Sequence, residues 1–260
     1  MALRHVTFYG CTPTLSLGLG ITQDVWAFAS MVQEKVLGQG ITVELFTLDG
    51  QPVESFSGIS MPAHGNLNCV PDTDLVILHA LWGDPVPILE QQLALLPQLR
   101  RWHEMGVPIL ALTTASFLLA EAGLLDGRPC TTHWHQHQAF ARRYPEVDFR
   151  KERFITATGE LYCVAGMNAA MEVIVHLLDR MSCTQVARAI EEMFLMDFRR
   201  GYSSEFIAVG GQTYHQDESI LQVQQWLEIH FASHITLQML ANKTNMSVRT
   251  FKRRFKEATG

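Results

Sequence analysis

The sequence lacks the features of a membrane or secreted protein. No apolar run in its 260 residues approaches the ~18 residues that a membrane-spanning helix needs. Residues 1–10 lack the basic and then apolar layout of a signal peptide. The five cysteines are odd in number, widely spaced and without a C-x-x-C pair: Cys11, Cys69, Cys130, Cys163 and Cys183. They predict neither a disulfide framework nor a zinc site, so we expect a cytoplasmic protein without membrane contact.

Motifs for metals and common cofactors are also missing or incomplete. There is no Walker A sequence and no G-x-S-x-G, and the stretch that opens at Gly18 lacks the third glycine of a dinucleotide fingerprint, which favours a loop there. His133, His135 and His137 alternate as metal ligands on a strand would, but nothing supplies a convincing fourth ligand. We therefore expect no metal and no cofactor.

Charge is distributed unevenly along the chain. The net charge is −6, but residues 235–260 contain six Lys and Arg against one acid and carry +5, which leaves −11 for residues 1–234. Such a distribution predicts a basic tail that meets a polyanion and an acidic body that is repelled by it. The hydrophobic content of 47% is enough for one large core and a second small one.

The first two hundred residues alternate strand-like and helix-like segments. Strands are predicted over 5–9, 41–48, 74–80, 107–112, 154–157 and 161–164, the last two as a hairpin. Helices are predicted over 21–37, 86–105, 115–122, 166–180 and 183–196. This alternation predicts an α/β fold with a mostly parallel sheet that is flanked by helices on both faces. In such sheets, ligands bind beyond the carboxyl ends of the strands.

The end of the chain has a different pattern. A helix over 217–231 precedes two short helices within 237–259, where Asn245 can take a left-handed turn and Ser247 is a good N-cap. Apolar side chains gather on one face of the second short helix: Val248, Phe251, Phe255 and Ala258. Cationic side chains gather on the opposite face: Arg249, Lys252, Arg253 and Lys256. These faces suit a recognition helix in a DNA major groove, and a solvated basic helix is the alternative.

The stretch ITLQMLANKTNMSVRTFKRRFKEATG, residues 235–260, resembles the first helix-turn-helix of AraC-type transcription regulators. The resemblance rests on Ala241, the Met-Ser entry to the second helix, the Arg-Arg-Phe core and the closing Thr-Gly. It implies binding to double-stranded DNA by the second helix and its N-cap: Arg249, Lys252 and Arg253 on bases, Arg254 and Lys256 on phosphates, and Ser247 beside them. Family members continue into a second helix-turn-helix, whereas this sequence stops at Gly260. We therefore expect either a truncated sequence or a protein with a single helix-turn-helix for DNA binding.

Residues 110–134, LALTTASFLLAEAGLLDGRPCTTHW, resemble the PfpI-like branch of the class I glutamine amidotransferase-like superfamily, which implies a flavodoxin-like fold. More closely, they resemble the sensor half of AraC-type regulators that carry such a domain. In enzymes of the superfamily a cysteine nucleophile occupies the turn that corresponds to Thr113, and His133 matches its partner imidazole. The early acidic residue of many relatives is absent from residues 12–19. Of these three catalytic groups the cysteine and the acidic residue are both absent, and only the imidazole of His133 remains. We therefore interpret the turn as a binding pocket and not a catalytic site.

The predicted pocket collects residues from the ends of neighbouring strands: Trp82, Gly83, Thr113, Thr114, His133 and Trp134, with Asp84 next to them. Hydroxyls, an imidazole, an aromatic wall and the N–H groups that open a helix suit a small polar metabolite that bears an amine or a carboxylate. The runner-up is a hydrolase or amidase that uses Thr113 or Cys11 with His133. A third reading is a binding module whose tail contacts a protein partner.

The two resemblances together predict the domain organisation. We expect a sensor domain over 1–198, a linker over 199–215 and a helix-turn-helix unit over 216–260. We also expect a homodimer that forms through the sensor domain, because paired half-sites offset the weak grip of a single reading unit.

Overall fold

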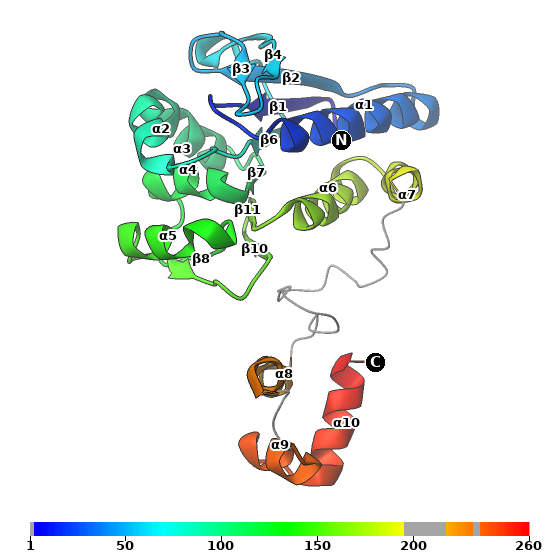
Figure 1. Ribbon diagram of the computed structural model, residues 1–260. Helices are drawn as coiled ribbons and strands as arrows, with labels where there is room; N and C mark the ends of the chain where they lie inside the picture. Colours follow the sequence, from blue (N-terminus) through cyan, green and yellow to red (C-terminus); the bar gives the residue numbers. More distant parts are fainter. Residues whose placement is uncertain (1–2, 195–216, 231–234, 260) are drawn as a thin grey trace. The chain divides into compact units, whose positions relative to one another are not determined.

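The computed structural model of the chain describes residues 3–194, 217–230 and 235–259 (Figure 1). The chain divides into two compact units, residues 1–202 and 203–260. The predicted linker, 199–215, lies outside the described residues. None of the helices in the described ranges is both long and apolar enough to cross a membrane.

A seven-stranded sheet, in the order β10-β11-β7-β6-β1-β2-β5, forms the centre of the first unit. Its strands are β1 (His5–Tyr9), β2 (Thr42–Thr47), β5 (Gly65–Asn66), β6 (Leu75–Leu78), β7 (Ile109–Leu112), β10 (Ile155–Thr158) and β11 (Leu161–Val164). All neighbouring strands run parallel except β10 and β11, which form the predicted hairpin. Strands β1, β6 and β7 are buried along their whole length, which is why the sequences of β6 and β7 are continuous apolar runs.

Helices cover both faces of this sheet (Figure 1). On one face α1 (Ser16–Leu37), α6 (Met167–Met181) and α7 (Thr184–Met193) contact one another. On the other face α4 (Ser116–Glu121) contacts α2 (Pro85–Gln91) and α3 (Leu96–Glu104), and α5 (His137–Arg143) follows. Two small sheets complete the unit: β3 (Val53–Glu54) with β4 (Ser60–Met61), and β8 (Pro129–Cys130) with β9 (Asp148–Phe149). The predicted α/β class is confirmed.

Two of the predicted helices have the wrong extent. Helix α1 begins at Ser16, so the glycine-rich stretch at Gly18 is helical and not a loop. The helix predicted over 86–105 is two helices with a break at Gln92. There the Gln92 side chain turns inward, and its Oε1 accepts a 2.6 Å hydrogen bond from the Tyr9 hydroxyl. The break therefore satisfies a buried hydroxyl in the core.

The second unit contains α8 (Glu218–His230), α9 (Leu237–Lys243) and α10 (Val248–Thr259). Its buried core comes from all three helices: Ile220, Val223, Leu240, Ala241 and Phe251. Between α9 and α10, Asn245 has a φ of 53° and makes the predicted left-handed turn. The Ser247 hydroxyl accepts a 3.2 Å hydrogen bond from the Thr250 N–H, which confirms the predicted N-cap.

Candidate functional site

A sharp turn, the elbow, joins β7 to α4 at Thr113. Its φ of 53° lies in the left-handed region, where a β-branched residue is strained by about 1–3 kcal/mol. The carbonyl of Thr113 accepts hydrogen bonds from the hydroxyls of Ser116, at 3.0 Å, and Thr132, at 3.1 Å. Both hydroxyl residues are fully buried. The turn expected at Thr113 is therefore present, and two buried hydroxyls stabilise it.

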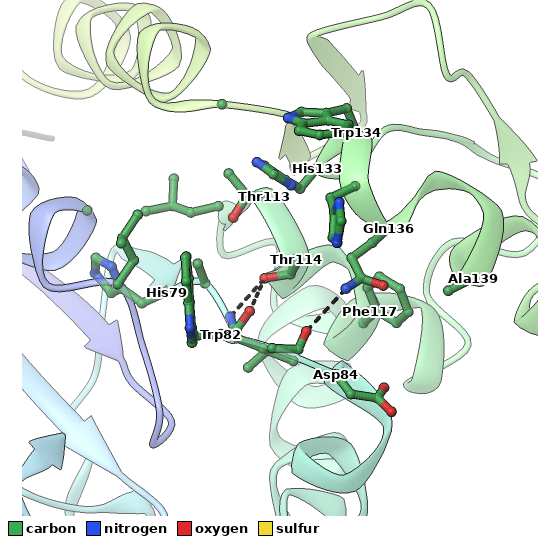
Figure 2. Close-up of a pocket in the computed structure, with 18 of the residues that line it drawn as sticks. His79, Trp82, Asp84, Thr113, Thr114, Phe117, His133, Trp134, Gln136 and Ala139 are labelled. Carbon is green, nitrogen blue, oxygen red and sulfur yellow. Dashed lines mark hydrogen bonds between the residues drawn. The ribbon is translucent and has the colours of Figure 1, made fainter. Parts of the chain in front are cut away.

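Thr114 follows the elbow and connects the ends of two neighbouring strands. Its hydroxyl donates to the carbonyl of Leu81 at 2.7 Å and accepts from the N–H of the same residue at 2.8 Å (Figure 2). The hydroxyl proton is thus used within the protein. Thr114 shapes the wall of the site, and its hydroxyl has no further proton to donate to a ligand.

A cavity of about 1160 Å³ opens over the carboxyl ends of β6 and β7. The six residues predicted for the pocket all line this cavity: Trp82, Gly83, Thr113, Thr114, His133 and Trp134. Trp82 is 42% exposed and Trp134 is 69% exposed, so these indoles border the cavity on its solvent side. The structure brings the predicted residues together around one space, and their role in binding a ligand stays a prediction.

Charged and polar groups from three elements complete the lining. The Asp84 carboxylate, which caps α2 by accepting from the Val86 N–H, and the exposed Arg142 of α5 carry opposite charges. Gln136 donates a 3.1 Å hydrogen bond from Nε2 to the Gly83 carbonyl and connects two sides of the cavity (Figure 2). His79, which follows β6, is buried beside the cavity. His79, Gln136 and Arg142 were not among the predicted pocket residues; of these only His79 lies near the end of a predicted buried strand, the signal that could have found it.

Two histidines near the elbow, His133 and His137, have lowered pKa values. Burial, followed by the nearby His135 and His137, lowers the pKa of half-buried His133. Burial also lowers the pKa of His137, whose Nε2 lies 3.2 Å from the Thr132 carbonyl. A neutral imidazole offers one donor and one acceptor, which suits hydrogen bonding to a polar ligand. No group of three His, Cys, Asp or Glu within the described ranges could hold a metal ion.

The thiol considered as a displaced nucleophile is Cys11. This residue is 3% exposed, and burial raises the pKa of its thiol to about 12. Because the thiolate and not the thiol is the reactive species, this burial disfavours Cys11 as a nucleophile.

Helix α10 presents the predicted cationic face to solvent. The exposed side chains are Arg249, Lys252, Arg253 and Lys256. On the opposite face Phe251 is 1% exposed and packs in the core of the second unit. Arg253 also forms a 3.0 Å ion pair with Glu257 one turn along. Both side chains of that pair are mostly exposed, so it competes weakly with a phosphate or a base.

Arg254 differs from the other residues predicted to contact DNA. Its guanidinium makes two 2.6 Å hydrogen bonds to the carboxylate of Asp217. This bidentate geometry is the strong form of the arginine–carboxylate pair. Asp217 lies directly before α8 and also accepts a 3.2 Å hydrogen bond from the Ile220 N–H. Arg254 therefore fastens α10 to the start of α8, a structural role that its position on the helical wheel did not reveal.

Comparisons with known proteins agree with this architecture. The sequence pattern of the DJ-1/PfpI family matches residues 24–180. The HTH-type transcriptional regulator CdhR of Pseudomonas aeruginosa is 27% identical over 238 residues, which cover 89% of this chain and 70% of CdhR. The HTH-type transcriptional regulator GbdR of the same species is 25% identical over 213 residues, which cover 81% of this chain and 57% of GbdR. The chain therefore spans only part of the length of these relatives.

A solved structure has the same fold as the first unit. It is that of an AraC family transcriptional regulator from Pseudomonas putida, with a TM-score of 0.60 and 21% identity over 74% of this chain and 99% of the solved chain. The PfpI-like resemblance predicted from residues 110–134 is confirmed, because the family pattern includes the elbow and extends over more than half of the sequence. The chain belongs to the DJ-1/PfpI family.

Proposed function

We propose that this protein is a DNA-binding transcriptional regulator of the AraC type, whose α/β unit senses a small polar metabolite. The observation that carries the proposal is α10, which has a buried apolar face and an exposed cationic face within a helix-turn-helix. The match to CdhR supports it, because that match covers 89% of the chain, and CdhR is named as an HTH-type transcriptional regulator. The bases would be contacted by Arg249, Lys252 and Arg253, with Lys256 on the phosphates.

The proposed ligand binds in the cavity over the elbow. Asp84 and Arg142 supply opposite charges to the lining, which suits a metabolite that bears an amine and a carboxylate. The indoles of Trp82 and Trp134 supply apolar walls around it. The proposal assigns binding and not catalysis to this site, because the elbow residue is a threonine and the thiol of Cys11 is buried and protonated.

The proposed active form is a cytoplasmic homodimer. A single helix-turn-helix engages few phosphates, so two copies on adjacent half-sites bind much more tightly than one copy on its own.

Fluorescence anisotropy tests the DNA-binding proposal. The full chain is titrated onto labelled duplex DNA from the region upstream of its own gene, at several salt concentrations. The logarithm of the affinity should fall linearly with the logarithm of the salt concentration, with a slope of about 0.9 per phosphate contact. The triple variant Arg249→Ala, Lys252→Ala, Lys256→Ala should bind weakly with a smaller slope.

A matched control separates the recognition helix from general charge. Lys35, Lys151 and Arg188 are exposed cations of the α/β unit, and replacing all three by alanine changes the net charge by the same amount. This control should keep the affinity of the parent chain. An equal loss in both triple variants would contradict the assignment of α10 as the DNA-reading helix.

The alternative function is a hydrolase or amidase, and the left-handed elbow at Thr113 is the observation that favours it. Such an enzyme would give a burst of p-nitrophenol from p-nitrophenyl acetate that depends on Thr113 and His133. We expect no burst above that of the Thr113→Ala variant. A burst that disappears in both Thr113→Ala and His133→Ala would establish the enzyme in place of the sensor.

A further inference from the structure

His79 is held firmly at the inner boundary of the cavity. It follows β6 directly, and its backbone N–H donates a 2.9 Å hydrogen bond to the Tyr9 carbonyl of the neighbouring strand. The imidazole packs against Phe8, with ring centroids 4.9 Å apart, and the residue is 1% exposed. Figure 2 shows it near Trp82, on the same side of the cavity. The ring is therefore a buried part of the cavity floor.

The side chain of His79 has an unmet hydrogen-bonding need. Its Nε2 is buried and has no hydrogen-bond partner among the residues that the structure describes. Burying a polar atom without a partner costs free energy, and a phenylalanine of similar shape would fill the same space without that cost. A histidine at this position is explained if a bound molecule completes the missing bond.

The residues around His79 restrict which ligand group can form the missing hydrogen bond. Burial lowers the pKa of His79 to about 3, so the imidazole is neutral and offers one N–H donor and one acceptor nitrogen. A half-turn about the Cβ–Cγ bond exchanges the positions of Nε2 and Cε1 without any backbone movement. The charged lining groups Asp84, Arg142 and Arg143 belong to exposed residues. A charged ligand group at the floor would lose its hydration without an opposite charge in return.

We propose that His79 binds an uncharged hydrogen-bonding group of the ligand, such as an amide, a carbonyl or a hydroxyl, at the floor of the cavity. The inference rests on the proposed sensing function of the same cavity and sharpens it. The ligand has a neutral polar end that reaches His79, and its charged groups lie near the exposed Asp84 and Arg142.

Nuclear magnetic resonance of the full chain labelled with ¹⁵N-histidine tests this assignment. The probes are three small molecules of similar length: propionamide, 1-propanol and the n-propylammonium ion. The resonance of His79 is identified by its loss in His79→Gln, and that of His133, which reports on another part of the cavity, by its loss in His133→Gln. Propionamide and 1-propanol should shift the His79 imidazole nitrogens saturably, and n-propylammonium should leave them unchanged.

The pattern of shifts separates the two proposals. Shifts at His133 with none at His79 would overturn the role of His79 and leave the sensing cavity intact. The absence of shifts at both histidines would count against the cavity as a ligand site altogether. An equal shift of His79 by n-propylammonium and by propionamide would overturn the preference for an uncharged group.

Two substitutions give an independent readout. His79→Phe keeps the ring shape and removes both nitrogens, whereas His79→Gln keeps a neutral donor and acceptor. The dissociation constant for propionamide should rise about tenfold in His79→Phe and less than about threefold in His79→Gln, as expected for one buried hydrogen bond. His79→Phe should also melt at a higher temperature than the parent chain, which excludes misfolding as the cause. Equal affinity in the parent and His79→Phe would overturn the proposal.

Discussion

Hydroxyls around the elbow of the α/β unit bond to nearby backbone groups, whereas four cations of α10 in the second unit are exposed to solvent: Arg249, Lys252, Arg253 and Lys256. The elbow borders a cavity in which burial lowers the pKa of His79 and His133. Helix α10 instead offers charges on an exposed surface. A preorganised interior suits a small ligand that leaves water behind, and a charged surface suits a polyanion that is recognised over many contacts.

The two units also differ in how much their stability depends on single residues. Among the described residues of the second unit, five are buried in its core, and Phe251 is the largest of them. Replacing Phe251 by Ala removes the central apolar contact, so we expect a loss of about 3–5 kcal/mol in the free energy of unfolding of that unit. Amide hydrogen exchange should show fast exchange throughout α9 and α10 and unchanged protection in the α/β unit.

The exposed Phe56 of the α/β unit provides the matched control. It is 54% exposed and stacks on Trp82 with ring centroids 4.1 Å apart. Phe56→Ala should change the stability of either unit by much less than Phe251→Ala does. Similar losses from the two substitutions would contradict the view that the small core depends on one ring.

Acid should weaken the α/β unit through His79. Burial lowers its folded-state pKa to about 3, and the unfolded chain binds a proton near pH 6.5. The contribution of the neutral His79 to the free energy of unfolding is fully present above pH 6.5. It is lost as the pH falls toward 3, at about 1.4 kcal/mol per pH unit, or about 2 kcal/mol by pH 5. Urea titrations at pH 7 and pH 5 should show a smaller loss in His79→Phe than in the parent chain. A parallel loss in both would show that other groups cause the acid sensitivity.

Substitutions of the neighbours Arg253 and Arg254 distinguish a residue that contacts DNA from one that stabilises the second unit. Arg253→Ala should weaken binding by about 1–3 kcal/mol and relax the preference at one base position, with little change in stability. Arg254→Ala should instead lower the melting temperature of the second unit, because it leaves the half-buried Asp217 without its bidentate partner. The affinity of the Arg254→Ala variant should fall by the same factor for all DNA sequences. A uniform loss from Arg253→Ala would reassign that residue to a phosphate.

Features of the fold that depend on a local sequence pattern were predictable. Buried strands such as β6 and β7 are apolar runs, and the two faces of α10 follow from a helical period. The left-handed Asn245 was also predictable, because few residues tolerate that conformation. Contacts between distant positions were not predictable in this way. Asp217 meets Arg254 across 37 residues, and Gln136 meets Gly83 across 53, distances over which periodicity carries no information.

His79 shows why part of the candidate site escaped prediction. A single histidine after a buried strand has no motif around it, and its significance comes from an unpartnered nitrogen beside a cavity. That observation requires the positions of all its neighbours. The elbow was easier to predict, because the resemblance of residues 110–134 to a known family carried Thr113 with it.

The smallest expected effect concerns the elbow itself, where Thr113 adopts a backbone conformation that its β-branched side chain disfavours. Thr113 has a φ of 53°, which glycine adopts without strain, so Thr113→Gly should stabilise the α/β unit by about 1 kcal/mol in urea titrations. Gly123, with a φ of 71° just after α4, tests the same rule in reverse, because Gly123→Ala should destabilise the unit by a similar amount. If the cavity binds its ligand through the fixed elbow, Thr113→Gly should also weaken ligand binding while the protein becomes more stable. A protein that is destabilised by Thr113→Gly would show that side-chain contacts of Thr113 outweigh its backbone strain.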